Sequence, residues 1–164
     1  MPSSPDQSAL NAALRLLSYR PRSIQEVYSR LARRFAIADV DGAIAFLQEQ
    51  GFVDDMAFAQ FWKESRRRNR PSSVAMMRSE LSRLGIARDI IDDTLDDVDD
   101  EEEARYAMEM AANKMKCMNY ESFFKKAGGH LRRRGFSYAI VKGTVERAWS
   151  ELTDSVSGYE DGND

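Results

Sequence analysis

Apolar residues recur every three or four positions along most of this chain, which is the spacing of one face of an α-helix. The chain has only four prolines and nine glycines in 164 residues, so long stretches lack a helix breaker. We therefore predict an all-α fold. Nine helices are expected, over residues 8–18, 23–35, 39–50, 55–70, 72–84, 87–98, 101–116, 121–134 and 137–152.

The ends of several predicted helices carry capping signals. Ser23 followed by Glu26 has the spacing of a capping box, and Asp54 or Asp55 is suited to cap the helix that follows it. A glycine followed by an apolar residue is typical of a left-handed helix C-terminus. This pair occurs after three of the predicted helices, at Gly51, Gly85 and Gly135.

The apolar pattern repeats with a period of fifty residues. Leu31, Leu81 and Leu131 mark this period, and the apolar positions around them are in register. Phe35 stands where the two later repeats have a glycine. Such a period is typical of tandem helical repeats that stack on one another.

We predict three tandem three-helix repeats in an elongated modular arrangement, over residues 8–53, 54–100 and 101–152. Residues 1–7 and 153–164 are polar and lack apolar periodicity. Both segments are therefore expected to be disordered, the second as an acidic tail.

Composition excludes several classes of function. With one cysteine, Cys117, and one histidine, His130, the chain can form neither an intramolecular disulfide nor a CxxC or multi-histidine metal site. We expect no enzymatic activity, cofactor or metal. The chain has no apolar run of membrane-spanning length and no export signal at its start, so we expect a cytoplasmic protein without a membrane partner.

The net charge of -3 conceals a strong segregation of charge. Nine of the 27 acidic residues lie in the window from 92 to 103, which has no lysine or arginine. The remaining chain has 24 basic and 18 acidic residues, a net charge of +6. Positive and negative charge are therefore concentrated in separate patches, and such patches determine which partners a protein surface attracts.

Arginines gather at the ends of the predicted helices. Arg33, Arg83 and Arg133 recur at the fifty-residue period, two positions after the repeat leucine and about 160° around the helix from it. A helix C-terminus favours any one arginine, but three at one repeat position form a basic ridge that suits a polyanion, either a phosphate backbone or an acidic groove on a protein. The predicted ridge comprises Arg30, Arg33, Arg34, Arg66, Arg67, Arg68, Arg70, Arg83, Arg88, Arg132, Arg133 and Arg134.

Three further features favour structural roles over chemical ones. The sequence KKAGGH at 125–130 lies inside a predicted helix and lacks a GKS or GKT ending, so neither a phosphate loop nor a functional role for His130 is expected. The acidic window lacks the alternating ligands of a calcium loop, and we expect a solvated helix face followed by a helix start. Trp62 and Trp149 have the helical spacing of core residues, so packing is favoured over base stacking.

Four motifs follow one another along the repeats: LLSYRPRS at 16–23, GFVDD at 51–55, RSELSRLGI at 78–86 and LRRRGFSY at 131–138. In this order, from about residue 9 to 152, the chain resembles the RecX family, whose members regulate the RecA recombinase of bacteria. GFVDD is similar to the family's Gly-Tyr-Leu-Asp-Asp motif. The chain departs from the family pattern at Phe35, where a glycine is usual, and at residues 70–72, where a glycine-containing turn is usual; both changes affect local helix ends.

The resemblance implies tandem three-helix repeats and no catalysis. It also implies a regulator in homologous recombination, DNA repair and the SOS response, which binds along the groove of the RecA filament on single-stranded DNA and restrains strand exchange, ATP hydrolysis and repressor cleavage. We expect a monomer that binds bare DNA weakly. The alternative is a direct DNA-binding protein whose second helices act as recognition helices of helix-turn-helix type.

Overall fold

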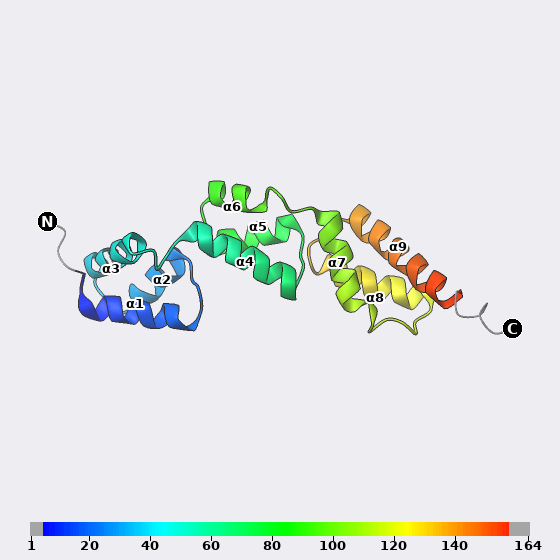
Figure 1. Cartoon of the computed structure of the whole chain (residues 1–164), viewed down its shortest axis with the longest axis horizontal. Coiled ribbons are helices and arrows are strands. Elements are labelled where there is room, and N and C mark those ends of the chain that lie inside the picture. Colours follow the sequence, from blue (N-terminus) through cyan, green and yellow to red (C-terminus); the bar gives the residue numbers. More distant parts are fainter. Residues whose placement is uncertain (1–4, 158–164) are drawn as a thin grey trace. The chain divides into compact units, whose positions relative to one another are not determined.

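The computed structural model describes residues 5–157, and within this range it contains nine α-helices and no strand (Figure 1). The all-α prediction is therefore confirmed. The helices are α1 (Gln7–Tyr19), α2 (Ile24–Leu31), α3 (Ile37–Glu49), α4 (Asp55–Asn69), α5 (Val74–Arg83), α6 (Arg88–Leu95), α7 (Asp100–Ala112), α8 (Tyr120–Arg132) and α9 (Tyr138–Ser157).

Helix ends account for most differences from the expected ranges. Helix α2 ends at Leu31 because the N–H groups of Arg34 and Phe35 both donate to the Leu31 carbonyl, at 2.9 and 3.0 Å, and close the chain into a turn. Helix α9 extends past 152, so residues 153–157 are helical where disorder was predicted. The Thr153 hydroxyl donates to the Ser150 carbonyl at 2.9 Å, which stabilises this polar turn. At the other end, Gln7 is the first residue of α1 and Asp6 is its N-cap, where disorder was also predicted. The predictions of disorder for 1–4 and 158–164 lie outside the described residues.

Side-chain caps fix where the helices begin. The Ser23 hydroxyl accepts from the Glu26 N–H at 3.1 Å, and the Glu26 carboxylate accepts from the Ser23 N–H at 3.0 Å, which confirms the predicted capping box. Other helices begin with a single side-chain acceptor, from Asp6, Asp54, Ser73, Asp99 or Asn119.

The three glycines that end helices have positive φ, namely 73° at Gly51, 80° at Gly85 and 86° at Gly135. Their predicted left-handed conformation is thereby confirmed. Phe35 is not among the positive-φ residues of the described chain. A side chain at this position therefore costs no backbone strain.

The chain divides into two compact units, each described here by itself. Unit 1 comprises residues up to 64 together with 78–96, and unit 2 comprises 65–77 together with the chain from 97 onward. Helices α4 and α5 therefore contribute residues to both units. The boundaries of the units thus differ from those of the three predicted repeats.

In unit 1, helices α1, α2 and α3 pack around a common apolar core. The repeat leucine Leu31 is buried there with Val27, one helical turn before it. The buried members of this core are Ala9, Leu10, Ala13, Val27, Leu31, Val40, Ala43, Ile44, Leu47 and Val53. Phe35 packs against its edge, so the residue that replaces glycine adds apolar contact.

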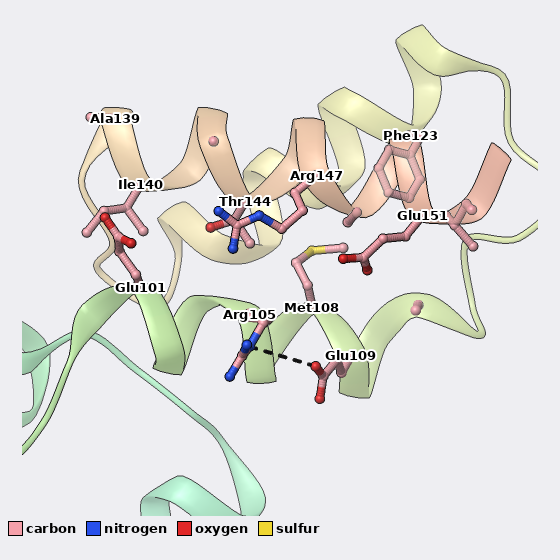
Figure 2. Close-up of a pocket in the computed structure, with 14 residues that line it drawn as sticks. Glu101, Arg105, Met108, Glu109, Phe123, Ala139, Ile140, Thr144, Arg147 and Glu151 are labelled. Carbon is pink, nitrogen blue, oxygen red and sulfur yellow. Dashed lines mark ion pairs between the residues drawn. The ribbon is translucent and has the colours of Figure 1, made fainter. Parts of the chain in front are cut away.

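In unit 2, helices α7, α8 and α9 enclose a second apolar core. Leu131 and Phe123 are fully buried in it, and the Trp149 ring packs on it with its centroid 5.2 Å from that of Phe123. A hollow of about 220 Å³ remains between α7 and α9 (Figure 2). Its lining includes Met108 and Ile140, and Arg105 and Glu109 form a 4.0 Å ion pair beside it.

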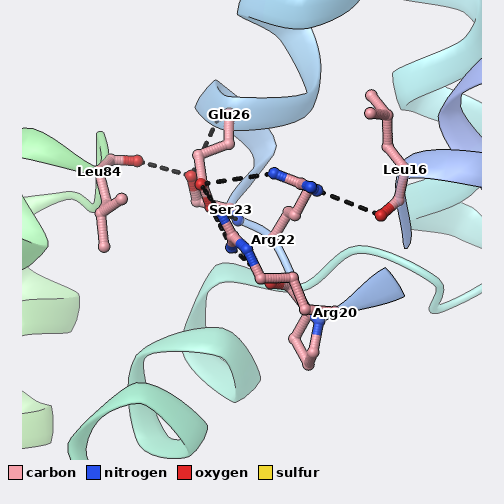
Figure 3. Close-up of polar contacts among 7 residues, drawn as sticks. Leu16, Arg20, Arg22, Ser23, Glu26 and Leu84 are labelled. Atoms are coloured by element: carbon pink, nitrogen blue, oxygen red, sulfur yellow. Dashed lines mark hydrogen bonds and ion pairs between the residues drawn. The ribbon is translucent and has the colours of Figure 1, made fainter. Parts of the chain in front are cut away.

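The start of α2 contacts the residue after α5, as Figure 3 shows for Ser23 and Leu84. It also contacts the start of α4 within unit 1. The Ser23 hydroxyl donates to the Leu84 carbonyl at 2.6 Å, and the Ile24 N–H donates to Asp55 Oδ1 at 2.9 Å. Ser23 is fully buried at this contact. We call Ser23, Ile24, Asp55, Leu84 and Gly85 the first junction.

Unit 2 contains an equivalent contact, in which the counterparts of Ser23, Ile24 and Leu84 lie fifty residues further along the chain. The Ser73 N–H donates to the Arg134 carbonyl at 2.9 Å, and the Val74 N–H donates to Asp100 Oδ1 at 2.7 Å. Ser73 is fully buried, as Ser23 is. We call Ser73, Val74, Asp100, Arg134 and Gly135 the second junction. We call the three helices of each repeat a helix triad. The sequence repeat thus specifies repeated contacts between helix triads as well as repeated helices.

Both junctions require glycine for a second reason besides its φ. A Cβ at Gly85 would lie 2.3 Å from the Cβ of Gln25, and a Cβ at Gly135 would lie 2.5 Å from the Ser73 hydroxyl. A Cβ at Gly51, which belongs to neither junction, would meet nothing within 4 Å. The junction glycines therefore allow two chain segments to approach each other closely.

Candidate polyanion-binding surface

The predicted ridge is divided between the two units. Unit 1 holds the arginines at the end of α2 and around the α5–α6 turn, and unit 2 holds those at the ends of α4 and α8. Ten of the twelve side chains are exposed, and Arg66 and Arg134 are half-buried. The ridge residues of unit 1 are Arg30, Arg33, Arg34, Arg83 and Arg88, and those of unit 2 are Arg66, Arg67, Arg68, Arg70, Arg132, Arg133 and Arg134.

The three arginines at the repeat position share one environment. Arg33 lies in the turn after α2, Arg83 is the last residue of α5, and Arg133 is the C-cap of α8. All three side chains are exposed. Each therefore extends from a helix C-terminus into solvent, as their angle from the repeat leucines predicts.

The ridge arginines Arg67 and Arg88 form ion pairs with the acidic window. Arg67 Nε lies 2.9 Å from a carboxylate oxygen of Glu103, and an Arg67 amino group lies 3.5 Å from Glu102. Arg88 lies 3.9 Å from Asp92. These pairs partly neutralise the charges of Arg67 and Arg88.

The acidic window has more structural roles than the expected solvated face. Glu103, in the first turn of α7, is only 2% exposed, so the window is not solvated along its whole length. Asp99 caps α7, and Asp100 belongs to the second junction. Among residues 5–157, no group of His, Cys, Asp or Glu side chains is placed to hold a metal ion.

A basic hollow of about 300 Å³ lies in unit 2 beside α7 and α8. No carboxylate occurs among its lining residues, and none of its basic side chains forms an ion pair with a carboxylate of the described chain. The basic lining consists of Lys114, Lys126, His130, Arg133 and Arg134. The remaining wall is formed by Asn69, Pro71, Ala107, Met110, Ala111 and Met115. We refer to this site as the basic hollow.

Burial and neighbouring positive charges both act on two side chains of the basic hollow, Arg134 and His130. The pKa of Arg134 is lowered first by desolvation and then by the positive charges of Arg70 and Arg133. The pKa of His130 is also lowered, first by desolvation and then by Arg134, with smaller effects from Arg133 and Lys114; a hydrogen bond with the backbone of Ala107 opposes them. Arg134 and His130 therefore lie in a partly desolvated space near other basic side chains.

The Arg134 side chain is held in the basic hollow by contacts with His130. One of its amino groups lies 3.3 Å from His130 Nδ1 and 3.4 Å from the His130 carbonyl. Its Nε is buried and has no hydrogen-bond acceptor among the described residues. Arg133 lies close to the helix, with an amino nitrogen 3.2 Å from where a Cβ on Gly129 would be. The arrangement holds both guanidinium groups at the end of α8.

The sequence missed three members of the basic hollow, Lys114, Lys126 and His130. Lys114 follows the end of α7, a position like that of the arginines at the end of α4. This similarity could have placed Lys114 among the predicted basic residues. His130 and Lys126 lie one helical turn apart on α8, which the helical spacing also indicates. As predicted, Gly128 and Gly129 lie inside α8 and offer no phosphate loop.

The two tryptophans, which were considered for base stacking, are at least partly buried. Trp149 packs on the core of unit 2 and makes an edge contact with Tyr120 at 5.3 Å, as the preference for packing over base stacking predicts. Trp62 is half-buried. No helix in the described part of the chain is long and apolar enough to cross a membrane.

Comparison with known proteins identifies relatives of this fold. The family models for the first and second three-helix domains of RecX match residues 9–47 and 54–95. The regulatory protein RecX of Chlorobium phaeobacteroides is 31% identical over 150 residues, which cover 90% of this chain and 97% of that protein. That of Chlorobaculum tepidum is 32% identical, covering 88% of this chain and 90% of the relative. The crystal structure of RecX from Lactobacillus salivarius matches with a TM-score of 0.67 and 24% identity over 86% of this chain and 94% of that one, which shows a shared fold.

Proposed function

Because the chain belongs to the RecX family, a family of regulatory proteins and not of enzymes, we propose that it regulates RecA by binding along the groove of the RecA filament on single-stranded DNA. Bound there, it restrains strand exchange, ATP hydrolysis and repressor cleavage by RecA. The protein acts by occupancy, because a chain that bridges neighbouring subunits opposes their rearrangement and excludes duplex DNA.

The observation that carries this proposal is the exposed arginine at one position of each helix triad, Arg33, Arg83 and Arg133. A filament presents the same surface again at each subunit. Equivalent groups on one chain can therefore bind several equivalent sites, and the linked contacts raise the affinity without a deep pocket. The two junctions support the same function. Each joins consecutive three-helix repeats through equivalent hydrogen bonds within one unit, as expected of a chain whose repeats bind equivalent sites.

Recognition-helix binding to bare DNA has less support. A recognition helix reads bases with residues near its N-terminus. In α2 and α5 this end is covered by the junctions, with Ser23 and Ser73 fully buried and the N–H groups of Ile24 and Val74 bonded to aspartates. The first turn of α8 is open but contains Glu121, whose charge repels phosphate.

The direct test is the DNA-dependent ATPase activity of RecA, measured with increasing amounts of this protein. Wild-type protein is expected to lower the rate. The triple variant R33E/R83E/R133E should need at least tenfold more protein for the same inhibition, because it reverses the three repeated charges.

A matched control reverses three other exposed basic residues, in the variant R15E/R105E/K142E. It has the same net charge as the first variant, so it should inhibit nearly as well as wild type. Absence of inhibition by the wild-type protein would refute the proposed function, and equal loss in both variants would refute the role of the repeated arginines.

A further inference from the structure

We infer that the basic hollow of unit 2 is a binding site for phosphate groups, supplied either by a nucleic-acid strand or by a free nucleotide. This inference goes beyond the regulation of RecA, and the basic hollow has only Arg133 in common with the three repeated arginines of the proposed function. It rests on the charge, the partial burial and the shape of a site whose lining contains no acidic residue.

The charge of the basic hollow exceeds what the fold requires. Cations often lie at helix C-termini, where each terminus is equivalent to about half a negative charge. The ends of α7 and α8 together therefore supply about one negative charge. Against this stand four permanent cations of the lining, Lys114, Lys126, Arg133 and Arg134. No ion pair with a carboxylate of the described chain offsets the remaining positive charge.

A bound anion would stabilise the arginines of the basic hollow. Arg134 is half-buried, its Nε has no acceptor, and it lies near the like charges of Arg70 and Arg133. A phosphate would supply acceptor oxygens to these guanidinium groups, which bind it with two parallel hydrogen bonds each. It would also offset the repulsion that the free protein sustains.

The shape and the apolar wall favour phosphate over the carboxylates of an acidic protein. A phosphate group with up to two negative charges and three strong acceptor oxygens concentrates its charge in one compact site, whereas carboxylates bring one charge each on separate side chains. The apolar part of the lining includes Met110, which is 48% exposed, and Pro71. Such adaptable apolar surface suits the sugar or base attached to a phosphate.

This site differs from the glycine-rich loop that the sequence excludes. In a phosphate loop, backbone N–H groups hold the anion. Here the glycines lie inside α8, and side chains from α8 and from the turn after α7 provide the donors. Gly129 contributes indirectly, because the absence of a Cβ leaves room for the Arg133 guanidinium.

The experiment is a titration of the full chain followed by two-dimensional NMR, without RecA. One arm uses tripolyphosphate and a second uses a short oligothymidylate, which separates free phosphate from strand phosphate. A third arm uses a glutamate peptide of equal charge. We expect shifts concentrated at residues 107–115 and 126–134 in the phosphate arms, with at least tenfold weaker binding by the glutamate peptide.

Paired variants test the site against general basicity. K114Q/K126Q removes two lining charges and should weaken phosphate binding at least tenfold. K116Q/K125Q removes two exposed charges one or two positions away that do not line the basic hollow, and should bind within twofold of wild type. Equal weakening in both variants, shifts spread over all basic residues, or tighter binding of the glutamate peptide would overturn the inference. Since no arm contains RecA, this failure would leave the proposed function untouched.

Discussion

The Ser23 hydroxyl donates a 2.6 Å hydrogen bond to the Leu84 carbonyl, across sixty-one residues of sequence. The same hydroxyl accepts from the Glu26 N–H and so caps α2. One buried oxygen thus begins a helix and joins two helix triads of unit 1. Helix formation and contact between repeats are coupled through this residue.

Replacing Ser23 by Ala should lower the free energy of unfolding by about 2 kcal/mol. Loss of the N-cap costs about 1 kcal/mol, and the partly buried Leu84 carbonyl left without its donor adds about 1 kcal/mol. Urea denaturation followed by circular dichroism measures the change. Ser29→Ala is the control, because Ser29 lies on the exposed side of the same helix. Equal stability of the two variants would show that the bond to Leu84 contributes nothing.

Gly85→Ala should destabilise the protein more than Gly51→Ala does. Both substitutions place a side chain at positive φ, which costs about 1–2 kcal/mol. At Gly85 the new Cβ would also overlap Gln25, whereas at Gly51 it meets nothing within 4 Å. Thermal unfolding of the two variants measures the difference. The same melting temperature for both would mean that Gln25 can move away from the new Cβ without loss of stability.

Much of the fold follows from local sequence signals. The capping box at Ser23 and the glycines at 85 and 135 depend on residues a few positions apart, so they could be predicted. The acceptor of the Ser23 hydroxyl could not, because it is set by packing between distant segments. The helical residues 153–157 were missed because hydroxyl bonds to preceding carbonyls stabilise a turn that has no apolar pattern.

The candidate surface was predictable only in part, for the same physical reason. The repeat period identifies Arg133 as outward-facing, since an angle around one helix suffices. It cannot show that Lys114 from the turn after α7 and Lys126 from α8 line one hollow with it. Nor can it show that Arg67 pairs with a buried Glu103, because both facts depend on how separate helices pack.

The pair of Arg67 and Glu103 predicts a strong coupling in a double-mutant cycle. Arg67→Met removes the cation 2.9 Å from a carboxylate that is 2% exposed, and should cost about 1–3 kcal/mol of stability. Glu103→Gln removes the buried charge, so Arg67→Met should cost much less in that background. Arg68→Met, one residue along α4, serves as the control. An equal cost of Arg67→Met in both backgrounds would contradict the pairing.

His130 should make the protein less stable as the pH falls below about 6.5, the ordinary histidine value. Its pKa is lowered in the folded protein by desolvation and by the charges of Arg134, Arg133 and Lys114. Between the folded and the unfolded pKa the unfolded state binds more protons, so the stability present at higher pH is lost as the pH falls through this window. Melting temperatures of wild type and His130→Gln, measured across the window, isolate the effect, since the chain has one histidine. Parallel curves would contradict the prediction.

The proposed function predicts that this protein binds RecA on single-stranded DNA at least tenfold more tightly than the same DNA alone. Exposed acids of the window at 92–103 repel a bare phosphate backbone, and the junctions cover the starts of α2 and α5. The variant D93N/D96N/E101Q should therefore gain affinity for bare DNA, with a steeper salt dependence, and change little toward the filament. The variant D41N/D154N/E49Q changes the charge equally at other exposed positions and should gain less. Fluorescence anisotropy over a range of salt concentrations measures both affinities, and equal affinity of the wild-type protein for the two substrates would favour direct DNA binding as its main activity.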